Sequence, residues 1–258
     1  MHPKLFSLGP IGIHSYGLFV LIGIAVALYV AIRNGRANGI SPPVIAEMGL
    51  FMAVVGVIGA RLAYVLMNLT YYVSNPEEIL MIWHGGLVFL GGMLLVIPAL
   101  LWYLRRRHLP FWRIGDLWAP SLAIGLAIGR IGCFMAGCCY GKPTGVKWGV
   151  VFSNPDSLAP LGIPLHPTQL YSSLAGVIIF LVLMALERRK HYEGQIFLWL
   201  LILHSTARLY LERFRGDISS TIPGTEMSLT QLLALLTLIT AVLGLMFRKS
   251  WIREKQGG

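Results

Sequence analysis

Three arginines of this sequence lie in or at the ends of long apolar stretches, where a charged side chain is costly. Arg61 lies deep in one stretch, Arg130 ends another and Arg208 lies in a third. A guanidinium in the hydrocarbon of a membrane costs roughly 3 kcal/mol on insertion scales, so each one needs a partner. Phosphate is suitable, because a guanidinium binds its oxygens with two parallel hydrogen bonds. Since the abundant phosphate of a membrane is a lipid headgroup, we expect these arginines to form a phospholipid site.

A carboxylate accompanies one of these arginines. Glu212 follows Arg208 by one helical turn and His204 precedes it by one turn, so a helix places all three on one stripe, with Arg215 continuing it. The Arg208–Glu212 pair either helps the helix pack as an ion pair or orients Arg208 toward a phosphate. Because arginines outnumber the nearby carboxylates, the phosphate-binding interpretation is favoured.

Paired glycines surround another apolar segment. Gly85-Gly86 and Gly91-Gly92 flank Leu87–Leu90. Small residues let two helices approach closely, which explains part of this pattern. Glycine pairs also occur where the backbone lies close to a ligand or where a broken helix lines a cavity.

Three cysteines, Cys133, Cys138 and Cys139, lie within seven residues. No histidine pair follows at zinc-finger spacing, so no metal site is predicted. Three interpretations stay open: small apolar structural thiols, a disulfide from Cys133 to Cys138 or Cys139 in an oxidising compartment, or a chemical role beside Arg130.

Composition indicates the elements that must position these residues. Of 258 residues, 56% are hydrophobic and only 12% are charged, whereas a soluble domain carries about 25% charge. We therefore expect an all-α membrane protein that forms a single integral membrane domain over residues 1–258. Its formal charge of +10 is explained by basic loops that face anionic lipid, so membrane lipids and not nucleic acid are the expected partners. The first apolar run has no basic segment before it and is expected to stay as a helix rather than be cleaved.

Seven apolar runs are long enough to cross a hydrocarbon core of about 30 Å. The predicted spans are 15–32, 44–68, 85–104, 115–131, 167–186, 194–211 and 229–247.

Basic residues predict the orientation of these spans. One set of ends carries thirteen of them: Arg33, Arg36, Arg105, Arg106, Arg107, Arg113, Arg188, Arg189, Lys190, Arg248, Lys249, Arg253 and Lys255. The opposite set carries five: Lys4, Lys142, Lys147, Arg213 and Arg215. Because basic residues are enriched on the cytoplasmic side, we expect the N-terminus outside and the C-terminus in the cytoplasm.

This orientation sends the segment between the fourth and fifth spans, residues 132–166, to the outer, periplasmic side. The segment is rich in glycine and proline, and Trp148–Phe152 has the composition of a short strand. We therefore expect an ordered periplasmic segment.

Several stretches together resemble the prolipoprotein diacylglyceryl transferase family, in order and over nearly the whole chain. They are Phe6–Leu18, Gly59–Arg61, Trp83–Gly92, Asp116–Pro120, Gly129–Gly132, His166–Tyr171 and Arg208–Arg215. The resemblance implies a bacterial inner-membrane enzyme whose active site faces the periplasm. Such an enzyme transfers diacylglyceryl from phosphatidylglycerol to the cysteine thiol of a prolipoprotein signal peptide and releases glycerol 1-phosphate, without a metal or cofactor.

The resemblance also assigns roles by matching position. The expected catalytic residues are Arg130, Arg208, Glu212 and Tyr16. The expected substrate-binding residues are Arg130, Arg61, Gly85, Gly86, Gly91, Gly92, Asp116, His166, Gln169 and Tyr171.

The sequence departs from the family pattern at four positions. Cys133 and Ala136 replace asparagines, Cys138 replaces an acid, and Leu90 replaces a histidine that is often considered the base. His84, in the same motif, is our candidate for a replacement base, because an imidazole titrates near neutral pH. Two alternatives to the family reaction remain: transfer of a lipid group to another acceptor, and a non-catalytic phospholipid-binding or transport protein.

Overall fold

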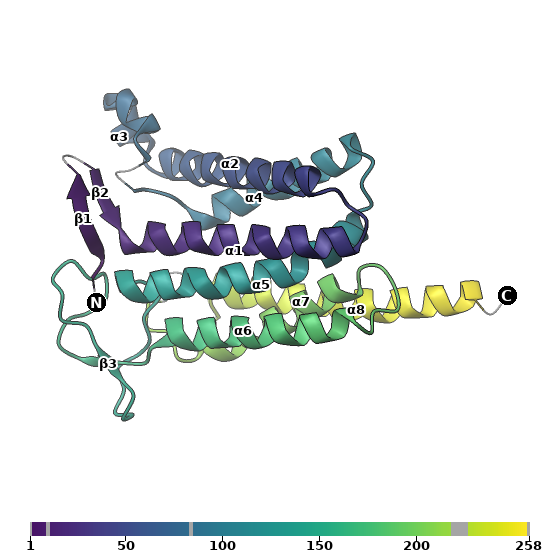
Figure 1. The fold of residues 1–258 in the computed structure, drawn as a ribbon. Helices are drawn as coiled ribbons and strands as arrows, with labels where there is room; N and C mark the ends of the chain where they lie inside the picture. The colour runs from purple at the N-terminus through teal and green to yellow at the C-terminus, as the bar shows by residue number, and fades with distance from the viewer. Residues whose placement is uncertain (1, 9–10, 83–84, 218–226, 257–258) are drawn as a thin grey trace. The chain divides into compact units, whose positions relative to one another are not determined.

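The computed structural model describes residues 2–8, 11–82, 85–217 and 227–256 (Figure 1). The described chain is mostly helical. Its helices are α1 (Ser15–Ala37), α2 (Pro42–Met67), α3 (Leu69–Ser74), the 3-10 helix η1 (Pro76–Leu80), α4 (Phe89–Arg106), α5 (Phe111–Ala136), α6 (Thr168–Glu187), α7 (Gln195–Glu212) and α8 (Leu229–Gln256).

Within the described residues, six helices are long and apolar enough to cross a membrane: α1, α2, α4, α5, α6 and α8. They match six of the predicted spans, so the expectation of a helical membrane protein is confirmed. The remaining prediction, 194–211, coincides with α7. This 18-residue helix carries His204, Arg208 and Glu212, and these polar groups lower its mean hydropathy. A seventh span stays a prediction.

Short strands accompany the helices at two places. β1 (Lys4–Leu8) and β2 (Ile11–His14) pair antiparallel directly before α1, in a segment for which the sequence analysis predicted no strand. β3 (Val150–Val151) pairs antiparallel with β4 (Pro164–Leu165). The strand expected at Trp148–Phe152 is thus confirmed, over a shorter range.

Backbone packing separates the chain into two compact units. The first contains Met1–Ala31 and Gly115–Gly258, and the second contains Ile32–Ile114. The expectation that residues 1–258 form a single membrane domain stays a prediction.

In the second unit, α2 and α4 pack through glycines. A Cβ on Gly91 would lie 2.1 Å from the Cβ of Ala63 and 2.8 Å from the carbonyl oxygen of Gly59. A Cβ on Gly92 would lie 2.9 Å from the carbonyl oxygen of Gly56. The pair Gly91-Gly92 therefore lets the two helix backbones touch, which is the packing interpretation of the glycine pattern.

In the first unit, α5, α6 and α7 enclose an apolar core, and Figure 1 shows them running side by side with α8. The core consists of Ala119, Ala123, Ile179, Leu183, Ile196 and Leu200. Gly23 of α1 packs directly on α5, because a Cβ there would lie 2.8 Å from the carbonyl oxygen of Gly125.

Asp116 fixes the start of α7. Its buried carboxylate accepts hydrogen bonds from the backbone amides of Gly194 at 2.6 Å and Phe197 at 2.9 Å, and it lies 2.9 Å from Lys190 Nζ. A carboxylate at a helix N-terminus satisfies amides that have no partner within the helix. Asp116, predicted to bind substrate, is thus engaged within the protein. It is separated from Arg130 by about 21 Å along α5, at 1.5 Å of rise per residue.

Candidate functional site

Half of the predicted site residues lie at one end of the first unit. Tyr16 is the second residue of α1, Arg130 lies in the last turns of α5, and Glu212 ends α7. Gly132 brings α1 and α5 together here, because a Cβ on it would lie 3.2 Å from the Tyr16 carbonyl oxygen. Tyr16 is within electrostatic range of Arg130, so helices distant in sequence converge on one polar region.

Arg208 and Glu212 form the expected ion pair, with 2.9 Å between Nη2 and Oε2. The Glu212 side chain is 2% exposed. Its Oε1 accepts hydrogen bonds from Ser228 Oγ at 2.8 Å and Thr230 Oγ1 at 2.7 Å, at the start of α8. Its Oε2 receives no aligned hydrogen bond from the described residues, so the contact with Arg208 is mainly one of charge. Glu212 is therefore held as a fixed anion beside Arg208.

Three guanidinium groups lie near one another. Arg208 is within electrostatic range of both Arg130 and Arg215. Arg215 forms two bonds with Asp217, at 3.0 Å and 2.9 Å. Within the described residues, Arg130 forms no ion pair. Three cations thus face two carboxylates, an excess of positive charge that suits an anionic ligand.

The placement of Arg215 corrects one expectation. Its predicted place on the same helical stripe as Arg208 is wrong, because α7 ends at Glu212. Arg215 reaches the site through the loop that follows, where its backbone pairs with Gly141.

Backbone hydrogen bonds join the segment Tyr140–Lys142 to the chain that carries Arg215 and form one side of the site. The Lys142 amide donates to the Phe214 carbonyl at 2.8 Å, and the Gly216 amide donates to the Tyr140 carbonyl at 3.0 Å. On the other side, the Gly141 amide donates to the His166 carbonyl at 3.1 Å. The segment Tyr140–Lys142 therefore lies between the chain after α7 and the chain before α6.

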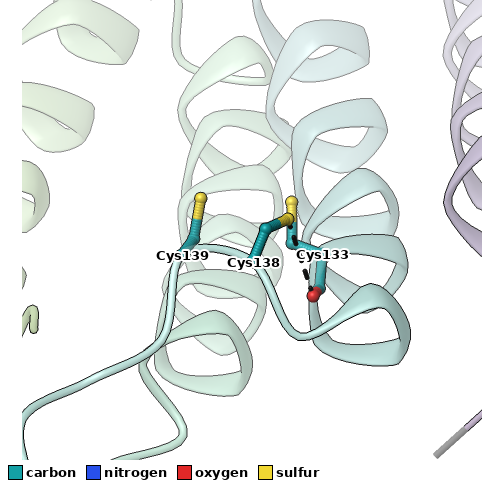
Figure 2. A group of neighbouring side chains, drawn as sticks. All are labelled: Cys133, Cys138 and Cys139. Carbon is teal, nitrogen blue, oxygen red and sulfur yellow. Dashed lines mark hydrogen bonds between the residues drawn. The ribbon is translucent and has the colours of Figure 1, made fainter. Parts of the chain in front are cut away.

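The three cysteines lie at the junction of α5 and this segment. Their Sγ atoms are all within 4.8 Å of one another, and all three thiols are free (Figure 2). Interaction with the thiols of Cys133 and Cys138 lowers the pKa of Cys139, against the effect of burial, and the charges of Arg130 and Arg215 lower it further. The positive charges of Arg130 and Arg215 thus favour the thiolate form of Cys139.

Predicted binding residues at the start of α6 contact this cluster. The Gln169 side chain is buried and donates through Nε2 to the Cys138 carbonyl at 2.8 Å, while its Oε1 has no partner among the described residues. His166 Nδ1 lies 3.3 Å from the Tyr171 hydroxyl, which accepts a hydrogen bond from Trp148 Nε1 at 2.8 Å. These side chains form a polar and aromatic border of the site.

Arg61, in the second unit, has its acceptors within the protein. Its guanidinium donates to the carbonyls of Glu78 at 2.5 Å, Gly85 at 2.6 Å, Ile79 at 3.0 Å and Gly86 at 3.1 Å, with a longer contact of 3.4 Å to Met81.

Glycine is required in the loop that Arg61 holds. Gly85 and Gly86 have positive φ angles of 86° and 72°, a conformation that other residues rarely adopt. Arg61 therefore holds this loop and satisfies its charge without phosphate, and its predicted contact with substrate stays a prediction. His84 lies outside the described residues, and Leu90 is exposed in the first turn of α4.

The sequence analysis missed several polar partners of the site, namely Thr168, Asp217, Ser228 and Thr230. One sequence signal was available for Ser228. Ser228 and Gln231 form a reciprocal capping box, with Gln231 Oε1 accepting from the Ser228 amide at 2.9 Å and Ser228 Oγ accepting from the Gln231 amide at 3.1 Å. A serine three residues before a glutamine marks such a helix start.

Comparison with known proteins gives a consistent result. The family model for prolipoprotein diacylglyceryl transferase matches residues 3–247. Similar curated proteins, all named phosphatidylglycerol–prolipoprotein diacylglyceryl transferase, come from several bacteria. That of Clostridium tetani is 32% identical over 94% of this chain and 96% of its own length. That of Geobacter sulfurreducens is 35% identical over 83% and 82%, and that of Pseudoalteromonas atlantica is 38% identical over 83% and 75%.

The carbonyl contacts of Arg61 lead to a testable prediction. Arg61→Lys keeps the charge, but an ammonium cannot reach all of these carbonyls. We expect residues 78–82 and 85–86 to exchange their amide hydrogens faster and the free energy of unfolding to fall by about 2 kcal/mol, the scale of a lost charged hydrogen bond. Hydrogen exchange with mass spectrometry measures the first effect, and thermal unfolding in detergent measures the second.

The matched control is Arg105→Lys, an exposed arginine at the end of α4, which should change neither measurement. Unchanged exchange in the loop together with weaker phosphatidylglycerol binding would instead make Arg61 a direct ligand of the substrate.

Proposed function

This chain belongs to the prolipoprotein diacylglyceryl transferase family, and we propose that it transfers diacylglyceryl from phosphatidylglycerol to prolipoproteins. The acceptor is the thiol of the cysteine in the prolipoprotein signal peptide, and glycerol 1-phosphate is released. The single observation that carries this proposal from the structure is the cluster of Arg130, Arg208 and Arg215, which has an excess of positive charge beside apolar helices.

The reaction breaks a carbon–oxygen bond and forms a carbon–sulfur bond. The acceptor sulfur attacks the glyceryl carbon that bears the phosphate oxygen, and the oxygen leaves with the bonding electrons as part of glycerol 1-phosphate. Negative charge grows on the leaving phosphate in the transition state. Fixed cations directed at that charge lower the barrier, because they need little reorganisation during the reaction.

The structure supports distinct roles for the arginines. Arg130 has no ion pair within the described residues, so it is available for the phosphate. Arg208 retains its charge contact with Glu212, which fixes the direction of the guanidinium. Tyr16, within range of Arg130, lies where it can line the lipid-binding side. We assign Arg130 and Arg208 to the leaving group and Glu212 to the positioning of Arg208.

The side of the membrane follows from charge. The excess of basic residues at one set of helix ends indicates that these ends face the cytoplasm, and the arginine cluster lies at the opposite ends of α5 and α7. We therefore place the site at the periplasmic side of the bacterial inner membrane, with α7 as the seventh span, the N-terminus outside and the C-terminus inside. Prolipoprotein signal peptides reach the enzyme in this membrane.

Removal of either arginine tests the proposal. We expect Arg208→Ala and Arg130→Ala each to reduce turnover of phosphatidylglycerol at least about 100-fold, the usual effect of losing one group that stabilises transition-state charge. Release of glycerol 1-phosphate from purified protein with a signal-peptide substrate measures the rate.

Arg213→Ala is the matched control, because Arg213 is an exposed arginine directly after α7. It should leave the rate unchanged. Turnover by Arg208→Ala at the unmutated rate would contradict the phosphate site. Failure of the unmutated chain to replace the transferase of a depleted strain would favour another acceptor or a binding protein.

The topology predicts a labelling pattern. Ser153 is exposed and lies in the segment between α5 and α6. In a chain whose three cysteines are replaced, Ser153→Cys should react with an impermeant thiol reagent in intact cells. A cysteine introduced at exposed Arg189, in the loop after α6, is the control and should react only after permeabilisation. The opposite pattern would reverse the orientation.

The proton acceptor for the incoming thiol is open to a direct test. We propose His84 for this role, since Leu90 replaces the histidine of the family pattern. His84→Gln keeps the polarity but removes the titrating group, so turnover should fall about 100-fold or more, as for loss of a general base. Phosphatidylglycerol binding should be preserved. A pH–rate profile unchanged between pH 6 and 8 would exclude His84.

A further inference from the structure

The cysteine cluster has the geometry of a binding site for a metal ion. Cys133 lies in the last turn of α5, and Cys138 and Cys139 follow the helix directly. Their three Sγ atoms lie within 4.8 Å of one another (Figure 2). A tetrahedral zinc ion with Zn–S bonds near 2.3 Å holds its sulfurs about 3.8 Å apart. Side-chain rotations that bring the sulfur atoms about an ångström closer together are therefore sufficient to place all three around one ion.

The backbone that carries these thiols is fixed by buried polar side chains. Thr168 Oγ1 donates to the Cys139 carbonyl at 2.7 Å, and Gln169 Nε2 donates to the Cys138 carbonyl at 2.8 Å. Both side chains are almost completely buried. A metal site needs such support, because partners behind the ligands set their orientation.

Cys139 occupies an unfavourable backbone conformation. Its φ angle is +58°, in the left-handed region where a residue with a side chain costs about 1–2 kcal/mol. Glycine would remove this strain, as it does at Gly137 nearby, which has a φ of +79°. Strained conformations are concentrated at functional sites, so the thiol of Cys139 has a use that offsets the strain.

The charges around the cluster fit three thiolates around one cation. Three thiolates carry a net charge of −1 with Zn²⁺ and −2 with Cu⁺, and Arg130 and Arg215 both lie within electrostatic range of Cys139. The disulfide and the apolar-packing interpretations explain the cluster less well. A disulfide leaves one sulfur out, and apolar packing does not account for thiols beside two arginines.

We propose that Cys133, Cys138 and Cys139 bind one thiophilic closed-shell cation, Zn²⁺ or Cu⁺, through three thiolates, with a fourth position open. An open position is the mark of a catalytic rather than a structural site.

The second part of the inference rests on the proposed function. The acceptor cysteine of the prolipoprotein takes the open position, and its thiol loses a proton to solvent on binding, because a coordinated thiol is deprotonated. The metal-bound sulfur then attacks the glyceryl carbon. The carbon–oxygen bond breaks as the carbon–sulfur bond forms, and glycerol 1-phosphate leaves with the electron pair, its phosphate beside Arg130. This thiol activation is an alternative to His84 as the means of deprotonating the acceptor thiol. His84→Gln decides between them, because unchanged turnover by that variant supports the metal and a large loss supports the histidine.

Metal content tests the first part. Untagged full-length protein, purified in detergent under reducing conditions, should retain about one zinc or copper ion per chain, measured by mass spectrometry of the elements. Separate titrations with Zn²⁺ and with Cu⁺ against a chromophoric chelator distinguish the two ions. Replacement by Co²⁺ should give sulfur-to-cobalt charge-transfer absorption.

Single substitutions locate the ligands. Cys133→Ser, Cys138→Ser and Cys139→Ser should each weaken binding at least about 100-fold, at the upper end of the effect of disturbing a metal's outer shell. His191→Gln, an exposed histidine on the loop after α6, should bind as the unmutated protein does. Thermal unfolding of each variant shows whether it is folded. Where a serine variant is unstable, the metal content of the unmutated chain still tests the proposal. Absence of metal affinity in the unmutated chain, or one reactive thiol instead of three in the denatured protein, would overturn the proposal.

Peptide binding tests the second part separately from the enzyme's activity. A signal peptide with its cysteine should shift the Co²⁺ absorption, whereas the same peptide with serine should not. Metal binding without turnover would refute the proposed function and leave the metal site standing. Full turnover by metal-free protein would refute the thiol-activation step and leave the proposed function standing.

Discussion

A guanidinium buried among apolar helices needs acceptors around its edge, and the two units of this chain meet that need differently. Main-chain carbonyls accept the hydrogen bonds of the Arg61 guanidinium, so this side chain holds a loop in place. Arg208 has one carboxylate, and Arg130 has no ion pair within the described residues. The same residue type is therefore saturated in one unit and unsaturated in the other. Only the unsaturated arrangement has charge left for an anionic substrate.

Glu212 connects this charge to the rest of the first unit. The carboxylate ends α7, faces Arg208 and accepts hydrogen bonds from Ser228 and Thr230 at the start of α8. Its burial makes the arrangement stiff, because a buried carboxylate without these donors would be strongly destabilised. The orientation of Arg208 thus depends on where α8 begins, although Glu212 and Ser228 are 16 residues apart in sequence.

Sequence patterns predicted the helices and strands of this chain better than the contacts between them. Hydrophobic runs located every long helix, and the composition of Trp148–Phe152 located β3, because these signals depend on local sequence. The ion pair of Arg208 with Glu212 was predictable from a spacing of four residues.

Contacts between distant segments were not predictable in the same way. Nothing local shows that Arg61 meets carbonyls of residues 78–86, or that Thr168 and Gln169 hold the cysteine loop. The end of α7 was predicted to within one residue, but the place of Arg215 was missed, because the helical stripe was extended beyond that end into a segment held by tertiary contacts. Within the cysteine cluster, sequence spacing left three interpretations, and the convergence of three sulfur atoms became visible only in the fold.

The hydrogen-bonded segment around Gly141 divides the chain between α5 and α6 into two parts with different freedom to change length. Tyr140–Lys142 is bonded on both sides, and a Cβ on Gly141 would lie only 2.4 Å from the His166 carbonyl oxygen, so an insertion there would displace the thiols and Arg215 together. Gly145 has no atom within 4 Å of an added Cβ, whereas Gly162 has a positive φ angle and its amide donates to the Phe152 carbonyl. The chain can therefore change length near Gly145 while the thiols and Arg215 stay in place.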